Sequence, residues 1–124
     1  MLSFVNRLSW YSYAWIYAMK KLIEYQDCVI QRGQIIKCQT PDERHSLCLM
    51  LCEVIGERYY QLLIVSGYKA GLHFTYLPLE AVDQQGSGIN ANWLIHNWHI
   101  WGYNACPLEQ VYILHEPYST FFNY

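Results

Sequence analysis

Histidine and cysteine pairs are the residues of this sequence that come closest to a chemical site. His96 and His99 are three positions apart, so a helix would place both imidazoles on one face, where they could bind zinc. Cys48 and Cys52 are four apart and would share one face of a strand. The zinc site lacks further ligands at suitable spacing, and residues 91–101 contain no carboxylate. We therefore predict no metal ion and no cofactor, and we interpret both cysteines as inward-facing core thiols.

The remaining polar patterns do not indicate an enzyme. A cysteine nucleophile paired with His45, His73 or His115 stays open as an alternative, but nothing in the sequence orients such a base. The acidic residues near 42–43 and 53–57 fall at predicted turns, which is typical of solvated surface charge. The Gly-Ser-Gly sequence at 86–88 lacks the Gly-Lys-Ser/Thr continuation of a phosphate-binding loop. We predict that the protein is not an enzyme.

The composition predicts one folded domain over residues 1–124. Hydrophobic residues make up 53% of the chain, aromatic residues 17% and charged residues only 15%, which is incompatible with disorder. The net charge is -2, and the basic residues are scattered, so the basic stripe of a nucleic-acid-binding protein is missing. Five cysteines without a Cys-x-x-Cys pair favour reduced thiols in a cytoplasmic protein.

The N-terminal segment is expected to form an amphipathic helix over residues 3–25. It is shorter and more polar than the run of about 20 apolar residues that a membrane span needs, and no signal-peptide cleavage site follows it. An alternative is a start at Met19, with residues 1–18 as a peripheral extension. The apolar stripe consists of Phe4, Leu8, Tyr11, Trp15, Ala18 and Leu22.

The rest of the chain predicts short strands and one further helix. Asn90 and Gly102 are plausible boundaries of a helix over 91–101, a segment that contains three of the five tryptophans. The fold class expected is α+β, with a small curved antiparallel sheet or open barrel of four or five strands, an N-terminal helix and the short Trp-rich helix near the C-terminus. The expected strands lie within 34–39, 46–55, 59–67, 71–79 and 110–115.

Residues 30–113 resemble a family of small bacterial immunity proteins, immunity protein 45, most specifically in the stretch 67–113. The resemblance lies in a glycine-led strand ending in Leu-Pro-x-Glu-Ala, then Trp-Leu-x-x-Asn-Trp-x-x-Trp, then a short Val-Tyr strand. It implies a cytoplasmic protein of polymorphic-toxin or contact-dependent-inhibition systems that binds and neutralises one toxin domain, as a monomer or a 1:1 complex. The matching motif residues are Leu77, Pro78, Glu80 and Ala81, then Trp93, Leu94, Asn97, Trp98 and Trp101, then Val111 and Tyr112.

The residues that contact the toxin are expected outside this shared motif, because toxins differ between systems. Acidic and aromatic side chains at predicted turns and at the C-terminus suit a protein partner. We expect neither nucleic acid nor membrane as a partner; the alternative is a small β-barrel module that binds a ligand or stacks bases on Tyr and Trp. The predicted partner-binding residues are Asp42, Glu43, Glu57, Tyr59, Asp83, Glu109, Glu116 and Tyr118.

Overall fold

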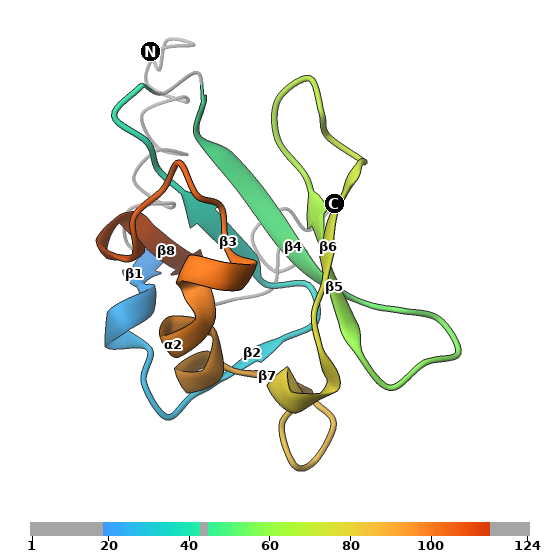
Figure 1. Cartoon of the computed structure of the whole chain (residues 1–124). Coiled ribbons are helices and arrows are strands. Elements are labelled where there is room, and N and C mark those ends of the chain that lie inside the picture. Colours follow the sequence, from blue (N-terminus) through green and yellow to red (C-terminus); the bar gives the residue numbers. More distant parts are fainter. Residues whose placement is uncertain (1–18, 43–44, 115–124) are drawn as a thin grey trace, which may run out of the picture.

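The described part of the chain, residues 19–42 and 45–114 of a computed structural model, is built mainly from antiparallel strands. A six-stranded sheet has the order β1-β8-β3-β4-β5-β6, and a two-stranded sheet pairs β2 with β7 (Figure 1). One α-helix lies within this part, α2 (Ala91–Trp101), together with the short 3-10 helices η1 (Leu22–Glu24), η3 (Leu79–Ala81) and η4 (Leu108–Gln110). The strands are β1 (Met19–Lys21), β2 (Val29–Gln31), β3 (Ile35–Cys38), β4 (Leu47–Glu53), β5 (Tyr60–Ile64), β6 (His73–Tyr76), β7 (Gly88–Asn90) and β8 (Val111–Leu114).

β4 and β5 are neighbours in the large sheet, and along both strands buried side chains alternate with less buried ones. Leu49 and Leu51 are fully buried and face Ile64 and Leu62 in the antiparallel register. The intervening β4 residues, among them Cys48 and Cys52, are only partly buried, so they point to the opposite face. The two cysteines therefore share a face as predicted. That face is turned away from the main core, and Cys48 packs instead against a second buried cluster that contains Ile35 and Leu114.

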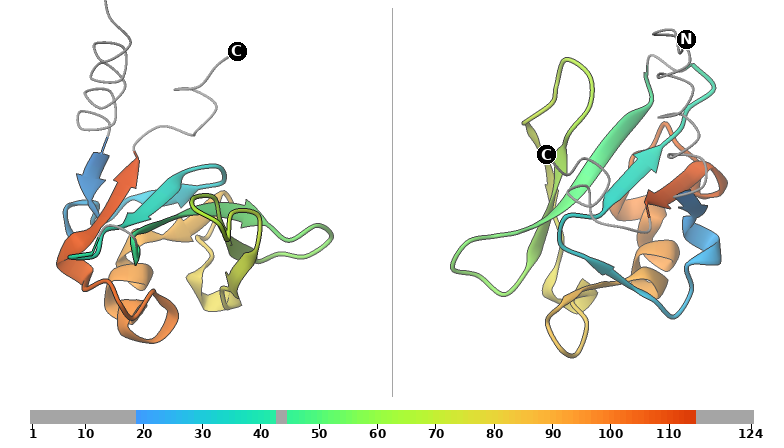
Figure 2. Two further views of the ribbon diagram at one scale, coloured as in Figure 1. Left: turned by 90° about the horizontal axis from the view of Figure 1, so that it is seen from above. Right: turned by 180° about the vertical axis from the view of Figure 1, so that it is seen from behind.

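The main hydrophobic core lies between the large sheet and α2. Figure 2, in the view from above, shows α2 and the segment that contains η3 on the same side of this sheet. Leu94 and Trp98 of α2 belong to one buried cluster with Leu22, Ile36 and Leu62. Burial of such side chains contributes about 1.5–3 kcal/mol each, and it fixes the helix against the sheet.

The two-stranded sheet positions the start of α2. β7 runs directly into the helix, and β2 holds β7 through pairing of Ile30 with Ile89. A Cβ atom at Gly88 would lie 2.1 Å from the carbonyl oxygen of Ile30, so only glycine allows this approach. Asp27, in the turn before β2, donates its backbone N–H to Asn92 Oδ1 at 2.9 Å and accepts a bond from Asn92 Nδ2 at 2.8 Å.

The end of α2 is fixed by the indole of Trp98. This side chain is 5% exposed, and its Nε1 donates a hydrogen bond of 2.9 Å to the carbonyl of Cys106. A Cβ atom at Gly102 would lie 2.3 Å from the indole ring. Gly102 has φ -89°, a backbone conformation that does not require glycine. The sequence placed the helix end correctly, but the glycine is there because the indole covers it.

The predicted fold class is wrong. The described residues form eight strands with a single α-helix, and the two ends of the large sheet, β1 and β6, do not pair with each other, so no barrel closes. Three strands escaped prediction because β1, β2 and β7 have only three residues each and pair with segments distant in sequence. The predicted helix over 91–101 agrees with α2 at both ends.

The N-terminal helix expected over residues 3–25 is contradicted where the structure describes it. Residues 19–21 form β1, paired with Tyr112–Leu114 of β8, and 22–24 form η1. The ladder to β8 and the complete burial of Leu22 outweigh the helical pattern of the local sequence. The part of that prediction on residues 3–18 lies outside the described residues.

Gly102→Ala is expected to lower the free energy of unfolding by about 1–3 kcal/mol, because the added methyl group overpacks against the indole. Urea denaturation measures the effect. In a Trp98→Leu background the same substitution is expected to cost less than about 0.5 kcal/mol, since the ring has gone. An equal cost in both backgrounds would contradict the clash.

Candidate functional site

A groove lies between the β4–β5 turn and the loop that joins η3 to β7. Its volume is about 510 Å³. Figure 1 shows both segments extending from the same end of the large sheet, the lower end in that view. We call it the hairpin groove. Its lining residues are Glu53, Glu57, Arg58, Tyr59, Tyr60, Leu79, Val82, Asp83, Gln84, Gln85 and Gly86.

Tyr60 joins the two walls of the hairpin groove. The side chain is 3% exposed and belongs to the main core. Its hydroxyl donates a hydrogen bond of 2.8 Å to the carbonyl of Gly86, in the opposite wall. Because a buried hydroxyl needs a partner, this bond holds the loop at 83–87 against the sheet.

Asp83 organises the loop wall from within. Its Oδ1 accepts hydrogen bonds from the backbone N–H of Ser87 at 2.7 Å and from the Ser87 hydroxyl at 3.3 Å. The Asp83 backbone N–H donates to the carbonyl of Gly88 at 3.0 Å, which connects the loop to β7. The carboxylate of Asp83 thus has a structural partner while it lines the groove.

Negative charges surround the phenol of Tyr60 in the hairpin groove. Burial raises the pKa of the Tyr60 phenol, and the charges of Glu53 and Asp83 raise it further, against an opposing effect of Arg32. Arg32 lies 3.4 Å from Glu53 in an exposed ion pair, and such pairs contribute little to stability. Two carboxylates from separate segments therefore act on one phenol.

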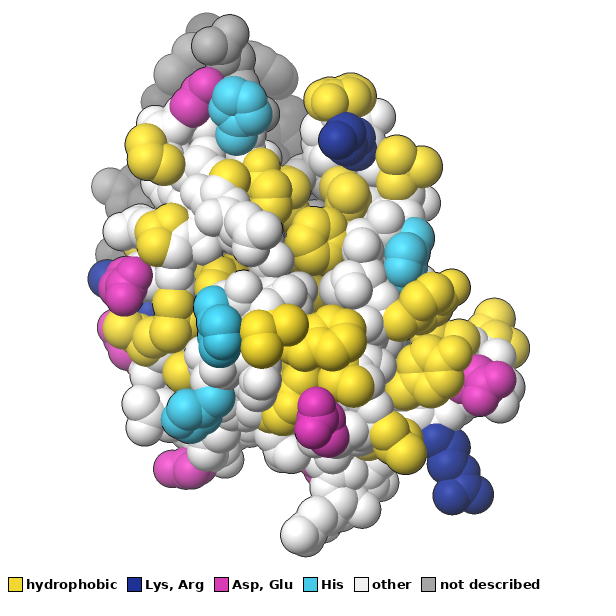
Figure 3. Space-filling model, in the orientation of Figure 1, with side chains coloured by type: hydrophobic (Ala, Val, Ile, Leu, Met, Phe, Trp, Pro, Cys, Tyr) yellow, Lys and Arg dark blue, Asp and Glu magenta, His cyan; other side chains and the backbone are white. Residues whose placement is uncertain are grey.

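Exposed apolar side chains border the hairpin groove. The rings of Tyr59 and Tyr76 meet edge to face with centroids 6.0 Å apart, and Tyr76 is 53% exposed. Leu79, at the start of η3, is 65% exposed, and Ile55, in the β4–β5 turn, is 98% exposed. Figure 3 shows hydrophobic side chains gathered over α2 and over the β5–β6 side of this face, with few basic ones. We call Tyr59, Tyr76, Leu79 and Ile55 the aromatic rim of the hairpin groove, and tyrosine is among the residue types enriched at protein interfaces.

Comparison with known families identifies the chain. The model of the family described as immunity protein 45 matches residues 22–113. The chain belongs to the immunity protein 45 family. No curated protein and no solved structure matches it.

The motif residues of this immunity protein 45 member have structural roles in and beside α2 and η3. Trp98 is buried, and the half-buried rings of Trp93 and Trp101 lie 6.1 Å apart. Asn97 Nδ2 donates to the carbonyl of Trp93 at 2.8 Å, within the helix. Pro78 precedes η3 as its N-cap residue, with φ -72°. These residues position α2 and η3 and do not line the hairpin groove.

The structure brings together three of the predicted partner-binding residues. Glu57, Tyr59 and Asp83 all line the hairpin groove. Glu109 is exposed on η4, immediately before β8, and lies outside the groove. Whether any of them binds a partner remains a prediction. The predictions at Glu43, Glu116 and Tyr118 fall outside the described residues.

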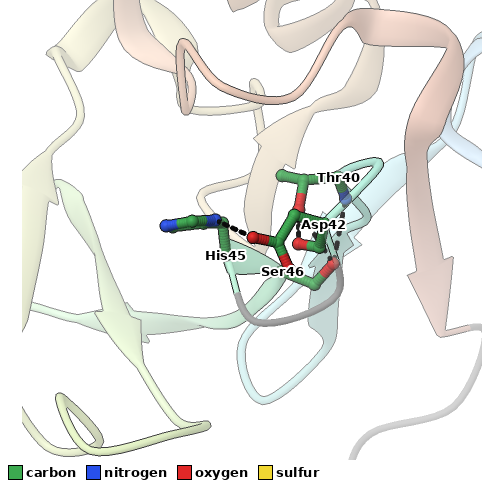
Figure 4. Close-up of polar contacts among 4 residues, drawn as sticks. All are labelled: Thr40, Asp42, His45 and Ser46. Atoms are coloured by element: carbon green, nitrogen blue, oxygen red, sulfur yellow. Dashed lines mark hydrogen bonds and ion pairs between the residues drawn. The ribbon is translucent and has the colours of Figure 1, made fainter.

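Asp42 belongs to a turn at the other end of β4. Its carboxylate lies 2.9 Å from His45 Nδ1, and its carbonyl accepts the hydroxyl of Thr40 (Figure 4). Ser46 Oγ accepts the backbone N–H of Thr40 at 2.9 Å. β4 has seven residues and spans about 23 Å at ~3.3 Å per residue, which separates this turn from the hairpin groove.

Several groove residues were not singled out from the sequence. Tyr60, Leu79 and Gln85 line it, and the exposed Tyr76 packs against Tyr59 at its edge. The turn expected between the predicted strands 46–55 and 59–67 was the available signal for one wall. Nothing in the sequence indicates that the loop at 83–87 forms the other wall.

The histidine pair considered as a zinc site has no further ligand grouped with it among the described residues. His96 and His99 are exposed on α2, and His96 Nδ1 lies 2.7 Å from the carbonyl of Asn92. Within residues 19–42 and 45–114, no three His, Cys, Asp or Glu side chains are grouped so as to hold a metal ion. In the same part of the chain, no helix has the length and apolar character to cross a membrane.

The cysteines differ in their surroundings. Cys28 is exposed, whereas Cys38 and Cys106 are buried next to each other's thiols. Cys106 Sγ contacts the carbonyl of Gln39 at 3.3 Å, and burial raises the pKa of Cys48. A raised pKa keeps a thiol protonated and unreactive, so Cys48 is a poor nucleophile.

Tyr60→Phe is expected to lower the free energy of unfolding by about 0.5–1.5 kcal/mol, because the hydrogen bond to Gly86 is lost. Amide exchange in the loop at 83–87 should accelerate as the loop separates from the sheet. Tyr76→Phe is the matched control, since Tyr76 is half exposed at the groove edge. Equal stability and loop exchange in both variants would contradict the role of the Tyr60 hydroxyl.

The raised pKa of Tyr60 predicts a pH dependence. The unfolded chain ionises this phenol at about pH 10, whereas the native protein keeps it protonated to higher pH. The stability that it contributes is therefore complete below about pH 10 and is lost as the pH rises further. The difference in unfolding free energy between wild type and Tyr60→Phe should shrink from pH 9 to pH 11; a constant difference would contradict the shift.

Proposed function

We propose that this protein neutralises a bacterial toxin domain by binding it in a stoichiometric complex, with the hairpin groove and its aromatic rim as the contact surface. The observation that carries the proposal is membership of the immunity protein 45 family over residues 22–113. Immunity proteins act as a group through a protein toxin partner. The proposed mode of action is occupation of the toxin surface, without turnover and without a cofactor.

The surface at the hairpin groove suits a protein partner. Tyr59, Tyr76, Leu79 and Ile55 present apolar area at one end of the sheet, next to the carboxylates of the groove. Aromatic anchors surrounded by polar groups dominate binding energy in many interfaces. A stable interface buries about 800 Å² on each partner. This area is larger than the surface that lines the groove, so the proposed contact includes the rim.

The biological setting is part of the same proposal. We propose a cytoplasmic protein of a polymorphic-toxin or contact-dependent-inhibition system, because a cell must intercept the toxin where it acts. The five free cysteines are compatible with a reducing compartment. We expect a monomer alone and a 1:1 complex with the toxin.

The test is capture followed by a protection assay. The tagged protein, expressed in its native host and purified in 0.5 M salt, is expected to retain one protein at equal stoichiometry, measured by intact mass. Expression of that protein alone in a susceptible bacterium should stop growth, and co-expression with this chain should restore it. The dissociation constant should be about nanomolar or lower, since the complex must survive purification.

The second arm of the test is a variant that lacks two of the rim side chains, Tyr59→Ala with Leu79→Ala. It should stay folded, because neither side chain is buried, and it should lose protection while keeping normal expression. Full protection by this variant would contradict the proposed surface. Absence of any toxic partner for the wild-type protein would contradict the proposed function itself.

A further inference from the structure

We infer that the toxin segment seated in the hairpin groove is a loop that carries lysine or arginine. The inference rests on the proposed function and concerns the chemistry of the partner at this one place. It follows from the charges, the walls and the size of the groove.

The charges of the groove are unbalanced. Three carboxylates line it, those of Glu53, Glu57 and Asp83, against the single guanidinium of Arg58. Glu53 is already paired with Arg32 and Asp83 with Ser87, whereas Glu57 has no ion pair within the described residues. The groove therefore presents an unneutralised carboxylate at the tip of the β4–β5 turn, beside two others.

The walls of the groove suit the long stem of a basic side chain. Leu79 and Val82 line one side and the ring of Tyr59 the other. Lysine and arginine bury their aliphatic stems on apolar surface while the charged group reaches polar partners, and arginine also stacks on aromatic rings. An acidic or phosphate-bearing segment would instead meet more carboxylates than cations in the lining of the groove, and like charges disfavour that contact.

The size of the groove fits a short loop better than a single side chain. Its volume of about 510 Å³ lies within the range of about 300–1,000 Å³ that holds ligands of many atoms. Gln84 and Gln85 in the loop wall can donate and accept hydrogen bonds with a backbone at this position. The occupant is therefore a loop whose basic side chain ends near Glu57.

The experiment compares two exposed glutamates that lie far apart. Glu57 is in the groove and Glu109 is on η4, so Glu57→Lys and Glu109→Lys change the net charge equally. The probe is the purified toxin domain recovered in the capture experiment, titrated by calorimetry at 50 mM and 300 mM salt. We expect Glu57→Gln to weaken binding about threefold and Glu57→Lys by at least about tenfold, with Glu109→Lys within about twofold of wild type.

The salt dependence separates a local contact from a general charge effect. For wild type the affinity should fall from 50 to 300 mM salt, and for Glu57→Gln it should fall less, because one attraction is missing. Equal weakening by Glu57→Lys and Glu109→Lys, or wild-type binding by both, overturns the inference and leaves the proposed function intact. No binding of the toxin by the wild-type protein overturns the proposed function.

Discussion

The hydrogen bond from the Tyr60 hydroxyl to the carbonyl of Gly86 is the contact on which the site depends. It connects a strand of the central sheet with a loop 26 positions later in the chain, and these two segments form the walls of the hairpin groove. Tyr60 is held in turn by the core, since its ring belongs to the same buried cluster as Leu62 and Ile89. The position of the acidic side chains is thus a consequence of core packing, although the side chains themselves are at the surface.

The residues of the family motif named above are separate from those that line the hairpin groove. Trp98 closes over Gly102 and is bound to the carbonyl of Cys106, which fixes the end of α2, while the ladder of β2 and β7 fixes its start. These contacts fix both ends of α2, and a preorganised scaffold binds a partner without a large entropic cost. The groove residues Glu57 and Tyr59 lie in a surface turn, outside these scaffold contacts.

The sequence predicted the elements whose pattern is local. β4 and β5 lie in apolar runs on either side of a turn, and α2 lies between a plausible N-cap residue and a glycine. It did not predict β1, β2 or β7, because three residues are too few for an alternation and their partners lie far away along the chain. It suggested Glu57, Tyr59 and Asp83 separately, but their common groove arises from the bond between Tyr60 and Gly86, which no local pattern encodes. The same limit applies to Asp42 and Glu109, which look equivalent to Glu57 in the sequence and lie elsewhere.

The most direct test of the account is hydrogen–deuterium exchange of the protein with and without the toxin domain that we propose as its partner. We predict that binding slows amide exchange at residues 53–60 and 79–87 together, since these segments form one groove. Residues 40–47 and 105–110, which contain Asp42 and Glu109, should exchange at the same rate in both samples. Protection confined to those two segments, with unchanged exchange at the groove, would contradict the account.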